Sequence, residues 1–341
     1  MTLLAVDVGR GTQDVLVYDP GRPVENCTKL VIPSPTVVVG QRIREAADRG
    51  EGVFLEGFTM GGGGVVQAVS EHLRRGLPVF ATEAAALTVH DNLEKVRALG
   101  IQIVPRRPMG TTIVRTTDYL EAELRTALGA FGVVYPGNFA FAVQDHGFSP
   151  AESNRIHRFR VLEQVLEEGG WQVRALAKDP PLPTMTRMAA LREQAPGALV
   201  IDTGVAAVLG VLCDPWVKER ATEGITLVNA GNAHTLCVNL RGEEVCGILE
   251  HHTASLDRDR LIALIGKLRD GTLRNEEVFG EGGHGARVHR PLPARHIAVT
   301  GPNRKGLLPD AYQAAPFGDM MLTGCFGLLR VWRQLRGGVP P

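Results

Sequence analysis

Cysteine is scarce in this sequence, and the few that occur are scattered. The five residues are Cys27, Cys213, Cys237, Cys246 and Cys325, and no two of them form a Cys-x-x-Cys pair. An odd number of isolated cysteines argues against a disulfide framework and against a structural zinc site. The spacing also provides no close triplet of the kind that holds an iron–sulfur cluster from one loop. We therefore expect buried free thiols, which pack as small apolar side chains.

A net charge and a long apolar run are also missing. Lys plus Arg and Asp plus Glu number 37 each, so no basic field attracts nucleic acid or an anionic membrane surface. No apolar run approaches the roughly 20 residues of a spanning helix, and the charged Asp7 comes too early for a signal peptide. These absences predict a globular, cytoplasmic protein that contacts small ligands.

The 341 residues suggest about two domains built from alternating strands and helices. Strand-like and helical patterns alternate from residue 52 to residue 105, which is typical of βαβ units and a parallel or mixed sheet. We expect helices from Pro150 to Glu168 and near the C-terminus, in "FGDMMLTGCFGLLRVWRQLR". The stretch "EGGHG", Glu281 to Gly285, is expected to be a mobile loop without neighbouring strands or helices.

The first residues, "LLAVDVGRGTQDVLVYD", predict a β-hairpin with a glycine-rich turn. Gly9 and Gly11 would let backbone amides approach an anionic ligand, although an ordinary tight turn would also use them. The turn is not a P-loop, because the Gly-Lys-[Ser/Thr] ending is absent. It is not a dinucleotide fingerprint either, because Asp14 stands in place of the third glycine and no helix follows.

Four segments in a fixed order carry a resemblance to a known superfamily. They are "VDVGRGTQDVLVYD", "ALVIDTGVAAVLGVLCD" (198–214), "TLVNAGNAHTLCVNL" (226–240) and "IAVTGPNRKGL" (297–307). This order resembles the actin, sugar-kinase and heat-shock-chaperone ATPases, with a first phosphate hairpin, a connecting segment, a second phosphate hairpin and a glycine turn against the adenosine.

The resemblance implies an α/β, two-domain actin-like (ribonuclease H-like) ATPase fold that binds ATP and Mg²⁺. The first domain would comprise residues 1–216 and 317–341, and the second residues 217–316. The region from about 40 to 197 matches nothing in the superfamily, so it would be a large α/β insertion or an altered first domain.

The superfamily pattern also implies roles for residues of the first hairpin and the connecting segment. Asp7 would hold Mg²⁺, unless it only caps its own turn. Gly9, Arg10, Gly11 and Thr12 would face the phosphates, and Arg10 could neutralise charge on a transferred phosphoryl group. Asp202 would orient the attacking water or act as the base, and a helix N-cap is an equally good and compatible interpretation.

In the second hairpin, Asn229 stands where the superfamily has an acid, which makes strong hydrolysis less certain. The residues expected to complete the nucleotide site are Gly231, Asn232, His234 and Thr235, with Gly301 in the later glycine turn. His234 could also be a hydrogen-bonded structural histidine.

Three further polar segments could belong to a site. "QDHG" places Asp145 beside His146 after the apolar run "FAFAV", and "EHHT" places Glu250, His251 and His252 after another strand. Because alternate side chains of a strand point to opposite faces, His251 and His252 should not bind one metal ion. We expect the two clusters either to contact a second substrate, with Asp145 and His146 as catalytic groups, or to be solvated turns. A glycine run before a helix, residues 59–73, would bind an anion or allow close packing.

More narrowly, the chain resembles a prokaryotic family labelled as pyruvate formate-lyase activating proteins. This resemblance rests on "DVGRGTQD", "QDHG", "NAGNAHT" and "EHHT". The label implies radical chemistry on a three-cysteine cluster, but the sequence has no Cys-x-x-x-Cys-x-x-Cys, so we do not expect that mechanism. The sequence instead favours a phosphotransferase or ATPase that acts on a small molecule. A nucleotide-gated regulator with a protein client is the main alternative, and a nucleotide-independent acid–base enzyme is the third.

Overall fold

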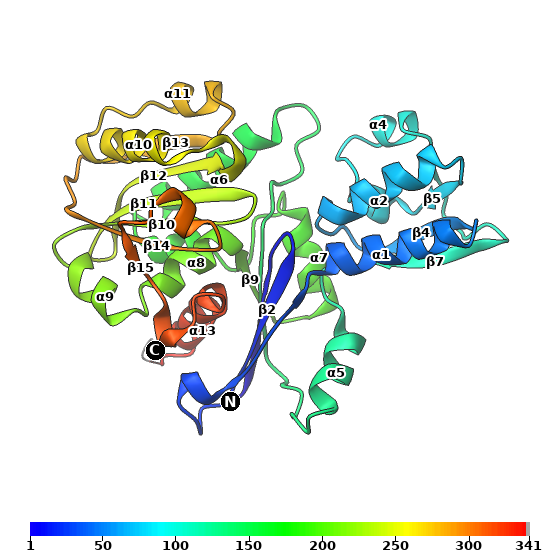
Figure 1. Ribbon diagram of the computed structural model, residues 1–341, viewed down its shortest axis with the longest axis horizontal. Helices are drawn as coiled ribbons and strands as arrows, with labels where there is room; N and C mark the ends of the chain where they lie inside the picture. The colour runs from blue at the N-terminus through cyan, green and yellow to red at the C-terminus, as the bar shows by residue number, and fades with distance from the viewer. Residues whose placement is uncertain (339–341) are drawn as a thin grey trace.

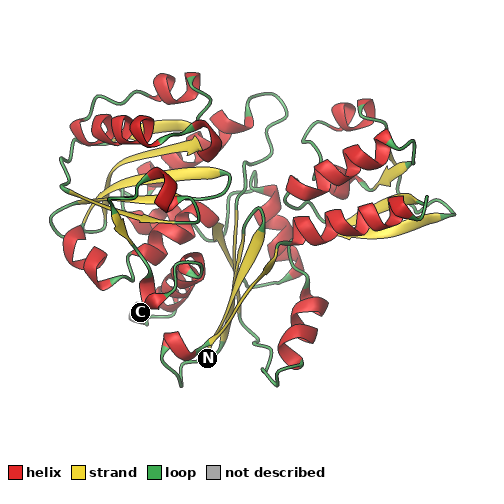
Figure 2. Cartoon of the chain, in the orientation of Figure 1, coloured by secondary structure: helices red, strands yellow, loops and turns green. Residues whose placement is uncertain are grey.

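The computed structural model describes residues 1–338 and contains three β-sheets flanked by helices (Figure 1). Figure 2 shows the sheets side by side, with helices on their faces. Sheet 1 has the order β3-β2-β1-β8-β9, sheet 2 has the order β13-β12-β11-β10-β14-β15, and sheet 3 has the order β6-β5-β4-β7.

In sheet 1, the opening hairpin lies next to two parallel strands. Strand β1 pairs antiparallel with β2 and parallel with β8, while β3 continues the antiparallel side and β9 the parallel side. The strands are β1 (Leu3–Val8), β2 (Thr12–Tyr18), β3 (Thr28–Pro33), β8 (Phe139–Val143) and β9 (Leu199–Asp202).

Sheet 2 repeats this five-strand arrangement and adds β13 at one edge. Strand β10 pairs antiparallel with β11 and parallel with β14, and β12 and β15 extend the two sides. The strands are β10 (Ile225–Ala230), β11 (His234–Arg241), β12 (Glu244–His252), β13 (Gly285–Val288), β14 (His296–Thr300) and β15 (Tyr312–Gln313). Two sheets with the relative order 3-2-1-4-5, each opened by a hairpin, form the two-domain ribonuclease H-like architecture of actin-like ATPases. This confirms the predicted fold class.

Sheet 3 forms a separate lobe that projects from sheet 1 (Figure 1). Its strands are all parallel: β4 (Gly52–Gly57), β5 (Val79–Ala81), β6 (Ile101–Ile103) and β7 (Thr111–Thr116). The lobe follows β3 in the chain and has its own apolar core, built on Val53, Leu55 and Val79. Strand β8 also lies within the range 40–197 expected to be inserted, yet it pairs with β1 at the centre of sheet 1.

The helices cover the faces of the three sheets. Helices α1 and α2 pack on sheet 3, α5 and α7 pack on one face of sheet 1, and α10 packs on sheet 2. The bounds are α1 (Pro35–Asp48), α2 (Gly63–Arg74), α3 (Glu83–Ala86), α4 (Leu93–Ala98), α5 (Glu121–Gly129), α6 (Asn154–Glu168), α7 (Thr186–Gln194), α8 (Thr203–Val211), α9 (Pro215–Ala221), α10 (Arg258–Asp270), α11 (Asn275–Gly280), α12 (Arg304–Leu307) and α13 (Thr323–Leu335).

Helices α8 and α13 cross between sheets 1 and 2 with their backbones in close contact. A Cβ atom on Gly210 would lie 1.8 Å from the carbonyl oxygen of Thr323, and one on Gly327 would lie 1.9 Å from that of Ala206. Glycine is required at such a crossing because any side chain would separate the helices. One apolar core therefore runs from sheet 1 through both helices into sheet 2. Within residues 1–338, no helix is both long and apolar enough to cross a membrane.

Candidate functional site

A cavity of about 700 Å³ opens where the three sheets meet, a volume suited to a nucleotide-sized ligand. Both hairpin turns reach it, together with the loops after β4, β8 and β14. The predicted site residues that line it are Asp7, Gly9, Arg10, Thr12, Asp145, His146, Asn229, Gly231, Asn232, His234 and Gly301.

The two turns have the same backbone geometry. The amide of Gly9 donates to the carbonyl oxygen of Thr12 at 2.9 Å, and the amide of Gly231 donates to that of His234 at 3.0 Å. A Cβ atom on either glycine would lie 2.8 Å from the same carbonyl oxygen, so the turn closes only around glycine. The first turn presents Arg10 to the cavity, and the second presents Asn232 and Ala233.

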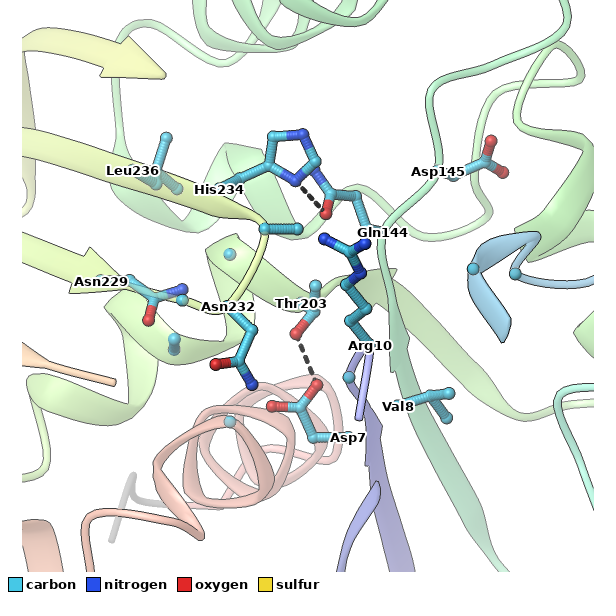
Figure 3. Close-up of a pocket in the computed structure, with 18 of the residues that line it drawn as sticks. Asp7, Val8, Arg10, Gln144, Asp145, Thr203, Asn229, Asn232, His234 and Leu236 are labelled. Carbon is cyan, nitrogen blue, oxygen red and sulfur yellow. Dashed lines mark hydrogen bonds between the residues drawn. The ribbon is translucent and has the colours of Figure 1, made fainter. Parts of the chain in front are cut away.

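Asp7 is the second-last residue of β1 and lines the cavity near Arg10 (Figure 3). Its carboxylate accepts a hydrogen bond of 2.6 Å from the Thr203 hydroxyl, and a Cβ atom on Gly324 would lie 1.8 Å from the other carboxylate oxygen. Burial raises the pKa of Asp7 to about 7, although the bond from Thr203 lowers it. Gly324 thus leaves a space for a carboxylate whose charge is poorly solvated.

Asp14 is the residue that our sequence analysis missed. It lies directly across the hairpin from Asp7, lines the same cavity, and has a buried carboxylate oxygen without a hydrogen-bond partner among the described residues. Burial and then the charge of Asp7 raise its pKa to about 8. The signal was available, because a four-residue turn between Val8 and Gln13 sets Asp7 opposite Asp14. Two adjacent carboxylates with raised pKa values form a site that a hard cation would neutralise.

The second turn has no such acidic pair. Asn229 lies opposite Leu236 and provides an amide in place of the charge. Gly301 follows β14 and has a φ of +93°. A Cβ atom at this position would lie 2.5 Å from the Ala230 carbonyl oxygen, so glycine permits close contact between β10 and the turn after β14. The Asn303 side chain donates to the Gly231 carbonyl oxygen at 3.0 Å and holds the turn in place.

Arg158 of α6 joins sheet 1 to sheet 2 at the wall of the cavity. It donates to both Glu250 oxygens at 2.7 Å and to one Asp202 oxygen at 2.7 Å. The side chains are almost fully buried, at 3, 1 and 6% exposure for Arg158, Glu250 and Asp202. Burial alone would raise the pKa of Glu250, but the guanidinium lowers it to about 2.

Asp202 has a structural role in this arrangement. Its second oxygen accepts the amides of Gly204 and Val205 and caps α8, as the N-cap interpretation predicts. Asp202 does not line the main cavity, and both of its carboxylate oxygens already accept hydrogen bonds within the protein.

Asp145 and His146 follow β8 and lie at the cavity wall. Both Asp145 oxygens accept backbone amides, from Gly147 at 2.8 Å and Met188 at 3.0 Å. Burial raises the pKa of Asp145 despite these bonds and the nearby arginines Arg187 and Arg158. His146 is half-buried, and its ring is directed toward His234 and His284.

Four histidines come together around this point. The rings of His146, His234, His252 and His284 have neighbouring centroids 4.6–5.5 Å apart. Burial is the main cause that lowers the pKa of His146 to about 2, of His234 to about 4 and of His284 to about 3. The imidazoles are therefore neutral at physiological pH.

The structure differs in detail from several sequence expectations. "EGGHG", expected to be a mobile loop, connects α11 to β13, which adds an edge to sheet 2. The His284 amide in this connection donates to the Glu250 carbonyl oxygen of β12 at 2.9 Å. "EHHT" continues β12 and is not a solvated turn; His252 lines the cavity and the buried His251 does not, as strand alternation predicts. Thr235 is fully buried against Thr253, and the exposed Gly11 does not line the cavity.

Sheet 3 provides the far wall of the cavity. The loop after β4 contributes Thr59 to Gly63, and the segment after β5 contributes Leu87 and Asp91. The glycines allow close packing, since a Cβ on Gly64 would lie 2.7 Å from the Thr36 carbonyl oxygen of α1. Ligands of parallel sheets bind at the carboxyl ends of the strands, and that end of sheet 3 faces the cleft.

The model of one protein family matches residues 60–306, well over half of the chain. Its description reads "Putative pyruvate format-lyase activating enzyme (DUF1786)". The chain belongs to this family. The matched range includes the histidine cluster, the second turn and strands β5, β6 and β7 of sheet 3.

No curated protein matches the sequence. Among solved structures, the chain is similar to an inorganic polyphosphate/ATP-glucomannokinase from Arthrobacter sp. strain KM, at 12% identity and a TM-score of 0.33 over 98% of this chain and 99% of that one. It is also similar to an exopolyphosphatase-like protein, at 11% identity and a TM-score of 0.30 over 89% and 67% of the two chains. A PPX-GPPA enzyme from Aquifex aeolicus is similar at 10% identity and a TM-score of 0.29, over 89% of this chain and 68% of that one. The strand order of sheets 1 and 2, and not these distant likenesses, carries the assignment of the fold.

Proposed function

We propose that this protein binds ATP and Mg²⁺ in the central cavity and transfers a phosphoryl group to water or to a small molecule. The observation that carries the proposal is the pair Asp7 and Asp14, which lie opposite each other at the first turn and both line the cavity; Gly324 leaves room for the Asp7 carboxylate. Mg²⁺ prefers such oxygen ligands and would neutralise charge on the phosphates.

The remaining groups of the cavity suit a nucleotide. Arg10 is exposed at the tip of the first turn and would neutralise the transferred phosphoryl group. Asn229 and Asn232 would donate to phosphate oxygens from the opposite turn, and Gly301 would lie against the adenosine. The phosphoryl acceptor would bind at the wall formed by sheet 3, whose loops are the part of the cavity that the two ribonuclease H-like domains do not supply.

Calorimetry with ATP and ADP, with and without Mg²⁺, tests this proposal. We expect Mg-dependent binding to the wild type, loss of that binding in Asp7→Ala, and unchanged binding in Asp48→Asn, whose carboxylate is 74% exposed on α1. If Asp7→Ala binds Mg-nucleotide as the wild type does while remaining folded, Asp7 is not in the site.

A nucleotide-gated regulator of a protein client is the second candidate, and Asn229 favours it. An amide in the second turn leaves less charge near the metal than an acid would, so turnover would be slow. Phosphate release separates the two functions: a phosphotransferase would speed up when its acceptor is supplied, whereas a regulator would bind ATP without faster release. Radical chemistry is not proposed, because the family label is not accompanied by a Cys-x-x-x-Cys-x-x-Cys motif.

A further inference from the structure

The histidine cluster has the geometry of a metal site. Within residues 1–338, the one group of three His, Cys, Asp or Glu side chains whose ligand atoms all lie within 4.8 Å is His146, His234 and His284. We propose that these three imidazoles bind one divalent transition-metal ion of the zinc class, in addition to the Mg²⁺ expected at Asp7.

The spacing of the nitrogens supports the proposal. The Nε2 atoms of His146 and His284 lie 3.4 Å apart. Two imidazole nitrogens on a tetrahedral zinc ion, each about 2.0–2.1 Å from the metal, are separated by about 3.3–3.4 Å. The side chains therefore require little movement to accept the ion.

The hydrogen bonds orient the rings as metal ligands. Nδ1 of His234 lies 2.5 Å from the Gln144 amide oxygen, an acceptor, so Nδ1 carries the proton and Nε2 keeps its lone pair. That Nε2 atom is buried and has no hydrogen-bond partner among the described residues. Nδ1 of His284 is buried without a hydrogen-bond partner among the described residues and lies 4.0 Å from a Glu250 oxygen, so it would need a small movement to donate to that carboxylate as the ring of a metal ligand commonly does.

The charges nearby also favour a cation. Arg158 is the one positive charge in the pair of salt bridges behind the rings, and Asp202 and Glu250 supply two negative charges. The buried network therefore carries a net charge of −1 before a metal binds, and a divalent ion beside it would be attracted.

The site would connect the two ribonuclease H-like domains. His146 follows β8 of sheet 1, whereas His234 and His284 belong to β11 and to the loop before β13 of sheet 2. Because His146 and His234 line the cavity, a ligand position left open by three histidines would face the cleft. Imidazole ligands select zinc-like ions, and the oxygens of Asp7 and Asp14 select Mg²⁺, so the two sites differ in ligand chemistry.

The experiment uses the full chain without a histidine tag, stripped with chelator and titrated with Zn²⁺ alone against a chromophoric competitor. We expect one ion per chain in the wild type and in the control His289→Gln, whose half-exposed ring stacks on Trp171. His146→Ala and His234→Ala should each weaken Zn²⁺ binding at least tenfold. Equal Zn²⁺ affinity in the wild type and in these folded variants would overturn the proposal.

A second measurement does not depend on the folding of any variant. Co²⁺ added to the stripped wild type should give the visible absorption of a four- or five-coordinate imidazole site, and one equivalent of Zn²⁺ should abolish it. If saturating Co²⁺ leaves only the spectrum of the hydrated ion, the site does not exist. Neither measurement includes nucleotide, so failure here leaves the proposed ATP site untouched, and the reverse also holds.

Discussion

Replacing Asp14 with Asn should change how Mg²⁺ binding depends on pH. In the wild type, the pKa values of Asp7 and Asp14 are raised to about 7 and about 8, chiefly by burial. A proton on either carboxylate must leave before the cation binds, so protons compete with Mg²⁺ across this pH range. Asn at position 14 preserves the shape of the side chain but removes one of the two titrating groups.

The size of the effect follows from the two pKa values. Each group multiplies the apparent dissociation constant by one plus the ratio of its protonated to its ionised form. Between pH 6 and pH 8, this factor falls roughly fiftyfold for a pKa of 8 and roughly tenfold for a pKa of 7. The wild type should therefore gain roughly 500-fold in Mg²⁺ affinity over this range, and Asp14→Asn only about tenfold.

Without metal, the sign for folding stability is the opposite. Both carboxyls have folded pKa values above the unfolded value of 3.8. The folded state therefore binds more protons than the unfolded chain between about pH 4 and pH 8, and the free energy of unfolding falls as the pH rises through this window. Asp14→Asn removes part of this loss, so in Mg-free buffer the variant should exceed the wild type in stability at pH 8 but not at pH 4.

Denaturant unfolding at pH 6, 7 and 8, with and without saturating Mg²⁺, measures both effects. The wild type should gain roughly fiftyfold more Mg²⁺ affinity than Asp14→Asn between pH 6 and pH 8, which corresponds to about 2 kcal/mol of additional Mg-dependent stabilisation when the ion is in excess. Asp48→Asn on α1 is the control and should behave as the wild type. A wild-type stabilisation by Mg²⁺ that is equal at pH 6 and pH 8 would refute the assignment of the pair as the cation site.

Three other changes test separate parts of the structure. Gly324→Ala should abolish Mg-dependent stabilisation, because the added Cβ would lie 1.8 Å from an Asp7 carboxylate oxygen and would push that carboxylate out of its position. Retained stabilisation would show that the carboxylate is not confined there. Arg158→Met should lower the free energy of unfolding by about 3–5 kcal/mol in denaturant titrations at pH 7, because two buried carboxylates lose their partner. The stability advantage of the wild type should diminish as the pH falls from 4.5 to about 2, where Glu250 becomes protonated. Gly210→Ala should lower the free energy of unfolding by about 1–3 kcal/mol or more, because its methyl group would separate α8 from α13; a change below 0.5 kcal/mol, about the size of a neutral surface substitution, would contradict the close crossing.

The sequence predicted the parts of the fold that local patterns encode. Apolar runs that end in small and acidic residues predicted the hairpins at residues 3–18 and 225–241 and the parallel strands 199–202 and 296–300. The sequence did not predict that β8 pairs with β1, because the partner of a strand depends on long-range packing and not on the strand's own composition. The edge strand β13 was missed for a related reason: a four-residue strand with charged and glycine neighbours has no alternating pattern.

The site divides along the same line. The turns were predicted because glycine spacing reports backbone geometry directly. Asp14 was overlooked because its role depends on register, which sets it opposite Asp7. The histidine cluster could not be found from spacing, since His146, His234 and His284 belong to distant segments that meet only when sheets 1 and 2 pack together.

The two hairpins have the same backbone but have diverged in the chemistry that they support. The first turn places two carboxylates in register and the second places an asparagine opposite a leucine, so the proposed Mg²⁺ site would belong to the first hairpin alone. The histidines span both sheets, and Arg158 binds carboxylates of both. A rotation of one domain against the other would leave the Asp7–Asp14 pair intact but would separate the three imidazoles. Zn²⁺ should therefore favour the closed arrangement of the cleft, whereas Mg²⁺ should bind whether the cleft is open or closed.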